Sequence, residues 1–182
     1  MKLIKFKLVL LLCFSSVMAA AQTLYSTTKG EVSFYSDAPL ETIEAINKSS
    51  AAIYNADNQE LAVQIRITEF EFQNKLMQEH FNENYLESEK YPTAVFKGRI
   101  KEKIAAGNSG NYPATAEGSM TIHGVTKAVT IPGTIQSSGG QLKFDFKFPV
   151  KLEDYKVEIP TIVFKKIAEV VEVSGSMTLV KK

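Results

Sequence analysis

The sequence predicts an all-β fold of about eight antiparallel strands with two short helical insertions. The first observation is alternation, since Leu142, Phe144, Phe146, Phe148 and Val150 are apolar while the residues between them are charged or proline. The second is turn chemistry, because Gly-, Asn- and Ser-rich segments separate the alternating runs. The third is continuity, since no linker or repeat divides the chain. Long strands with one apolar face indicate a closed barrel or a sandwich, and a barrel of roughly eight strands can hold one small ligand.

The first 21 residues are predicted to be a secretory signal peptide. Three lysines in the first seven residues precede the apolar run Leu8–Met18, and Ala19–Ala21 matches an A-x-A cleavage site. A membrane anchor is the alternative, but the run is shorter than the roughly 18–20 residues that a span needs. We therefore expect cleavage before Gln22, leaving residues 22–182 as one soluble periplasmic domain.

Composition and motifs argue against several function classes. The chain has 21 Lys and Arg against 20 Asp and Glu, which is no electrostatic signature for nucleic acid. The only cysteine, Cys13, lies in the predicted signal peptide, so neither disulfides nor thiol chemistry are expected. His80 and His123 are the only histidines and have no metal-ligand spacing. With no phosphate-binding loop or nucleophile elbow, we expect no metal, no cofactor and no catalytic residues.

One helical insertion is predicted near the start of the mature chain. Leu40, Ile43 and Ile46 lie three residues apart and follow Pro39, which favours a helix over Leu40–Lys48. Alternation around this helix predicts the strands Thr23–Thr28, Glu31–Ser36, Ala51–Asn55 and Leu61–Ile67, with a register change near Thr68-Glu69.

The second insertion is an amphipathic helix over Gln73–Leu86. Met77, Phe81 and Tyr85 recur every four residues, and polar residues fill most of the other positions. Such a helix is expected to act as a lid or plug at one end of the sheet.

A hairpin over Gly118–Pro132 lies at the centre of the predicted fold. His123-Gly124 separates two alternating runs, and Gly124 can adopt the positive φ that a two-residue turn requires. We interpret His123 as a turn residue that hydrogen-bonds backbone, the alternative being a catalytic base. The other strands expected in this half are Thr93–Ile104, Tyr112–Ile122, Leu142–Val150 and Ile167–Val180.

The predicted inner surface combines large and small side chains. The phenylalanines of Leu142–Val150 are expected to face inward, and the inward face of Tyr112–Ile122 carries mainly small residues. Such a surface suits a long apolar ligand, because apolar burial dominates binding in pockets. Periodicity alone is equally compatible with the alternative, in which these phenylalanines fill a dry core. The residues predicted to line a ligand cavity are Phe96, Ala114, Ala116, Met120, Phe144, Phe146, Phe148, Val171 and Val173.

Tyr91–Gly98 reads Tyr-Pro-Thr-Ala-Val-Phe-Lys-Gly, and Gly118–Lys127 reads Gly-Ser-Met-Thr-Ile-His-Gly-Val-Thr-Lys. These two segments resemble motifs of the YceI-like family. The resemblance covers nearly all of the mature chain. Shorter matches lie at His80-Phe81-Asn82, Glu89-Lys90, Asp154-Tyr155 and Ile159-Pro160.

The resemblance implies a lipocalin-like, eight-stranded antiparallel barrel that is exported and often forms a homodimer. It also implies binding of a polyisoprenoid or fatty-acyl lipid in the barrel, for carriage, storage or stress response, and supplies no catalytic residues. The alternative is an envelope enzyme or a structural stress protein that uses His123 or His80. Leu40–Asn58 departs from the longer members of the family, so the resemblance does not extend to the mouth of the cavity.

Overall fold

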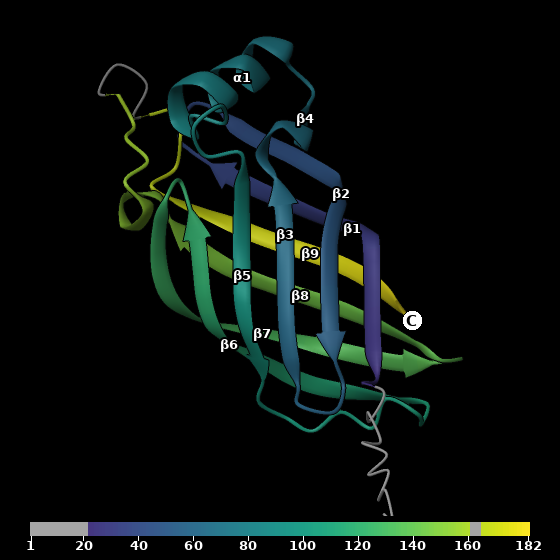
Figure 1. The fold of residues 1–182 in the computed structure, drawn as a ribbon. Helices are drawn as coiled ribbons and strands as arrows, with labels where there is room; N and C mark the ends of the chain where they lie inside the picture. The colour runs from purple at the N-terminus through teal and green to yellow at the C-terminus, as the bar shows by residue number, and fades with distance from the viewer. Residues whose placement is uncertain (1–21, 161–164) are drawn as a thin grey trace, which may run out of the picture.

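The computed structural model describes residues 22–160 and 165–182, and within them eight long strands close into an antiparallel barrel (Figure 1). The order around the wall is β1-β9-β8-β7-β6-β5-β3-β2, and pairing of β1 with β2 completes the ring. This confirms the predicted eight-stranded barrel, while the predicted signal peptide lies outside the described residues. The strands are β1 (Leu24–Asp37), β2 (Thr42–Asn55), β3 (Glu60–Arg66), the two-residue β4 (Glu71–Phe72), β5 (Thr93–Ile100), β6 (Gly110–Ile122), β7 (Val125–Ser138), β8 (Gln141–Lys151) and β9 (Val170–Lys181).

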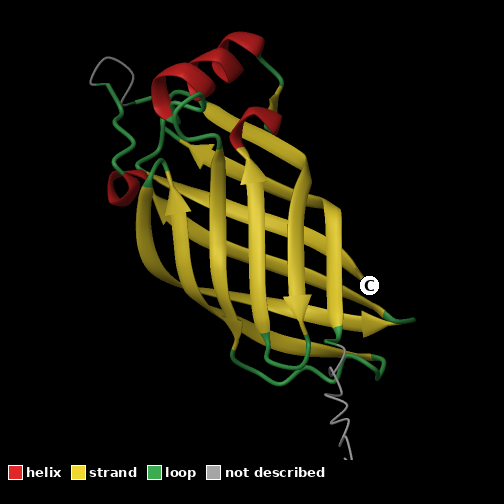
Figure 2. Ribbon diagram, in the orientation of Figure 1, coloured by secondary structure: helices red, strands yellow, loops and turns green. Residues whose placement is uncertain are grey.

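A short helix covers one end of the barrel (Figure 2). Helix α1 (Lys75–His80) continues into the π-helical turn Phe81–Tyr85. Asn74 caps the helix, since its side chain accepts hydrogen bonds from the backbone N–H groups of Leu76 and Met77. The predicted helix over Gln73–Leu86 is therefore confirmed in position.

The opposite end of the barrel is filled by side chains. Tyr54 is fully buried and packs edge-on against Phe144, with ring centroids 5.4 Å apart. Because β2 and β8 are not neighbours in the wall, this pair bridges the barrel interior. The residues that fill this end with Tyr54 are Tyr25, Leu142, Met177 and Leu179, each at most 3% exposed.

The prediction of a helix over Leu40–Lys48 is wrong, because this segment is the start of β2. Leu40 is 68% exposed and precedes the strand. The strand's alternation is concealed because one buried position is Asn47 rather than an apolar residue. Its amide donates to the Arg66 carbonyl oxygen, and its side-chain oxygen accepts from Ser50 Oγ at 3.0 Å. Pairing with β1, the preceding strand, therefore overrides a helical spacing of apolar residues.

Other predicted boundaries shift by smaller amounts. The two predicted N-terminal strands are one strand, β1, with register irregularities on either side of Gly30. The register change near Thr68-Glu69 is a 3₁₀ turn, Ile67–Glu69. Strand β5 ends at Ile100, after which Ile104 is buried in a loop, and β9 begins three residues later than predicted.

One stretch of the wall is closed by side chains rather than by a backbone ladder. Pairing between β7 and β8 runs only from Gly133 opposite Phe146 to Ser138 opposite Gln141. The first half of β7 pairs with β6, and the last residues of β8 pair with β9. The 3₁₀ turn η3 (Leu152–Tyr155) contacts both strands, and Tyr155 is buried there.

Candidate functional site

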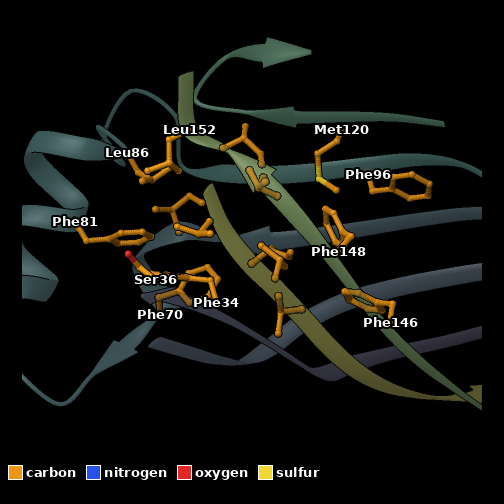
Figure 3. A pocket seen from close by; sticks show the side chains of 18 of the residues that line it. Phe34, Ser36, Phe70, Phe81, Leu86, Phe96, Met120, Phe146, Phe148 and Leu152 are labelled. Atoms are coloured by element: carbon orange, nitrogen blue, oxygen red, sulfur yellow. The ribbon is translucent and has the colours of Figure 1, made fainter. Parts of the chain in front are cut away.

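The barrel encloses a cavity of about 480 Å³ beneath α1 (Figure 3). In Figure 3, Phe81 and Leu86 lie at the helix end, whereas Phe96 and Phe146 lie further along the barrel. All nine residues predicted to face a cavity line it, from Phe96 on β5 to Val173 on β9. A filled core is therefore wrong for this half of the barrel and correct for the other half. That the nine residues contact a ligand stays a prediction.

Glycines in the wall explain how inward phenylalanines leave a cavity open. Gly98 and Gly118 are directly opposite each other on β5 and β6, and the ring of Phe96 lies against Gly98. In the same way, Phe146 on β8 is opposite Gly175 on β9, and its ring occupies the place of the absent side chain. The rings thus cover backbone instead of projecting across the barrel, which keeps the interior hollow and apolar.

Sequence reasoning missed a cluster of four aromatic rings at the helix end of the cavity. The Phe81 ring lies 5.4 Å from that of Phe34, 5.6 Å from Phe70 and 5.0 Å from Phe72, measured between centroids. Figure 3 shows Phe81 pointing from the helical segment toward Phe34 and Phe70. The four-residue spacing of Met77, Phe81 and Tyr85 was the available signal, but it did not identify the partners on β1 and β4.

Most of the polar and exposed residues that line the cavity lie near α1, with Thr134 on β7 and Asp145 on β8 among the exceptions, and we take the α1 end as the mouth. Asn74 and His80 are exposed there, and Lys166 Nζ lies 3.8 Å from Glu41 Oε2. Ser36 is buried, and its hydroxyl accepts from the Ala168 N–H at 2.9 Å. Burial raises the pKa of the Tyr85 phenol, which therefore stays neutral. Away from α1, Asp145 is a charged lining residue, and its carboxylate lies 3.1 Å from Lys143 Nζ.

The Tyr54 hydroxyl is buried and has no hydrogen-bond partner among the described residues. Burial, and secondarily Tyr25, raises the pKa of Tyr54 from 10.0 to about 12. We expect Tyr54→Phe to raise the free energy of unfolding by about 1–2 kcal/mol, because it removes an unsatisfied polar group. The unfolded phenol ionises first, so wild-type stability falls above pH 10 and the difference should widen toward pH 12. Urea unfolding of both proteins at neutral and alkaline pH measures this, and a less stable Tyr54→Phe at neutral pH would contradict it.

His123 joins three separate segments at the mouth end of the wall. It occupies the predicted turn with φ of +50°, followed by Gly124 at +72°. Its Nε2 lies 2.6 Å from Glu87 Oε2, and its Nδ1 lies 3.2 Å from the Tyr155 carbonyl oxygen. The Tyr91 ring packs edge-on at 4.7 Å between centroids. The two ring nitrogens thus tie the β6–β7 turn to Glu87 and to the backbone of η3.

We expect His123→Ala to lower the free energy of unfolding by about 1–3 kcal/mol while apolar-ligand binding persists. The loss comes from the Glu87 and Tyr155 contacts, and chemical denaturation measures it. His80→Ala is the matched control, since His80 is exposed, and should stay within about 0.5 kcal/mol of wild type. A His123→Ala protein that is as stable as wild type would refute this structural role.

Within residues 22–160 and 165–182, no cluster of three or more His, Cys, Asp or Glu side chains is placed to hold a metal ion. Among the same residues, none of the helices has the length and apolar character needed to cross a membrane.

The chain is similar to one family model and to several solved structures. A family model for the YceI-like domain matches residues 15–179. A polyisoprenoid binding domain from Saccharophagus degradans, implicated in plant cell wall breakdown, has a TM-score of 0.78 and 13% identity, covering 89% of this chain and 100% of its own. Burkholderia cenocepacia BcnA has a TM-score of 0.68 and 22% identity, and the match covers 83% of this chain and 96% of BcnA. The Campylobacter jejuni YCEI protein has a TM-score of 0.60 and 16% identity, and the match covers 75% of this chain and 82% of that protein. With identities below 25%, these structural matches show a shared fold. No curated protein matches the chain.

Proposed function

This chain belongs to the family of YceI-like domains, and from that premise we propose that its barrel binds one long apolar chain, a polyisoprenoid or a fatty-acyl lipid. The observation that carries the proposal is the cavity of about 480 Å³, whose deeper wall is made predominantly of aliphatic and aromatic side chains. A void of this size within a barrel is costly to leave empty, because its lining loses packing contacts. An apolar ligand restores those contacts.

The comparison structures support the same ligand class. One of them is described as a polyisoprenoid binding domain, and it covers nearly nine tenths of this chain. The mouth beneath α1 would hold the polar end of such a molecule, since the polar residues Asn74, His80 and Lys166 line the cavity at that end. Holding a chain requires no bond to form or break.

Native mass spectrometry after gentle purification tests the proposal. We expect an added mass that solvent extraction removes and that fragments as an isoprenoid or acyl lipid. The delipidated protein should then rebind prenyl or acyl chains. A protein that is isolated without a ligand and binds neither class would refute the proposal.

The enzyme alternative rests on His123 or His80. Both ring nitrogens of His123 are engaged by Glu87 and Tyr155, which favours the structural role over a catalytic base. Turnover that survives delipidation and is lost in His123→Ala would favour the enzyme instead.

The proposal extends to export and assembly. We propose that the protein acts in the periplasm after cleavage before Gln22, and the N-terminal sequence of the periplasmic protein tests this. An N-terminus at Met1 would contradict it. Homodimer formation stays a prediction, to be measured by light scattering.

A further inference from the structure

We propose that the filled end of the barrel limits the bound chain to roughly four isoprene units, with Tyr54 as the residue that sets this length. The inference rests on the proposed function and adds to it a size class of ligand. It comes from the division of the barrel interior into a hollow half beneath α1 and a solid half at the opposite end.

The volume of the hollow half gives the length. In another protein, an apolar cavity of about 150 Å³ holds one benzene molecule of six carbons. By the same ratio, the cavity of about 480 Å³ holds roughly 20 carbons, which is four isoprene units or one long acyl chain. A longer prenyl chain would extend through the mouth beneath α1 into water.

The floor of the cavity is formed by the ring pair that crosses the barrel. Phe144 lines the cavity, whereas Tyr54, which packs against it at 5.4 Å, does not. Beyond Tyr54, the fully buried Leu142 and Leu179 occupy the interior. The tyrosine ring therefore stands where a fifth isoprene unit would continue, and its six ring carbons take about the space of that unit.

Affinity as a function of chain length tests the limit. Prenyl alcohols of two to nine isoprene units, delivered from cyclodextrin, compete against one fluorescent acyl probe on the delipidated protein. For wild type we expect about a fourfold gain per buried carbon up to four units, and no gain beyond. A gain that continues to nine units would overturn the length limit and leave the proposed function intact. Failure of every length to bind would overturn both.

Two variants should move the limit in opposite directions. Tyr54→Ala vacates the space of one ring and should extend the gain to about five units. Ala114→Phe, at a lining position on β6, should shorten it to about three units. The matched controls carry changes of the same kind on outward positions: Ile53→Ala, next to Tyr54 on β2, and Thr130→Phe on β7. Both should keep the wild-type limit.

Circular dichroism and thermal melting establish first that each variant is folded. If Tyr54→Ala fails to fold, Ala114→Phe decides alone, because adding a ring to a hollow does not remove core packing. A folded Ala114→Phe protein with the wild-type length limit would overturn the proposal.

Discussion

Ala116→Phe is expected to lower the affinity for a long apolar chain by about 100-fold, without loss of stability. Ala116 is buried at the middle of β6 and lines the cavity between Ala114 and Met120. A phenylalanine ring there displaces the equivalent of about three or four methylenes, each worth about 0.8 kcal/mol. The same ring fills empty space, so the free energy of unfolding of the ligand-free protein should rise by up to about 2 kcal/mol.

Thermal melts and a prenyl-chain binding assay on the delipidated protein measure the two effects. Thr130→Phe introduces the same ring on the outer face of β7 and should leave affinity unchanged. An Ala116→Phe protein that melts well below wild type would show that the interior closes up in solution, since overpacking costs about 1–3 kcal/mol. Unchanged affinity in a stable variant would place the ligand elsewhere.

Gly118→Ala is expected to be the most destabilising single methyl addition in the wall, costing at least about 3 kcal/mol. A Cβ at Gly118 would overlap the Lys97 carbonyl oxygen and the Gly98 backbone on β5. Both obstacles are main chain and cannot rotate away, so the β5–β6 pair must separate. Ligand binding should fall as well, because the ring of the lining residue Phe96 lies against Gly98.

Gly107→Ala provides the control for this prediction, measured by urea unfolding alongside Gly118→Ala. A Cβ at Gly107 meets nothing within 4 Å, and the residue lies in the loop between β5 and β6. We expect no destabilisation, and a gain of up to about 1 kcal/mol from the restricted unfolded chain. If both variants lost the same free energy of unfolding, the close approach of β5 and β6 would not be the reason that position 118 requires glycine.

The barrel and most of its lining are predictable from the sequence because alternation reports directly which face of a strand is buried. The row Phe144, Phe146 and Phe148 and the small residues of β6 needed only a period of two. The error at Leu40–Lys48 has the opposite cause. The buried Asn47 donates a hydrogen bond to the Arg66 carbonyl oxygen, which is distant in the sequence, and no local pattern reports such a partner.

The boundary between the hollow and solid halves could not be predicted either. Tyr54 and Phe144 lie 90 positions apart in the sequence, on strands that are not neighbours, and only the closed ring brings them together. Gly175 was visible in the sequence, but its register opposite Phe146 was not, and neither was the register that places Gly98 opposite Gly118. Whether an inward ring fills a barrel or lies flat on its wall depends on that register.

Closure of the ring through β1 and β9 sets the order of events in folding. Tyr25 pairs with Lys181 and Tyr35 with Glu172, so this seam joins segments from opposite ends of the domain. Contacts of such sequence separation form slowly, because the loop-closure entropy must be lost before they contribute. Until β9 docks, the β1–β2 hairpin has an unpaired edge along most of its length, and another copy's β9 offers the same hydrogen bonds. Refolding at high concentration should therefore favour strand-exchanged oligomers over barrels closed within one chain.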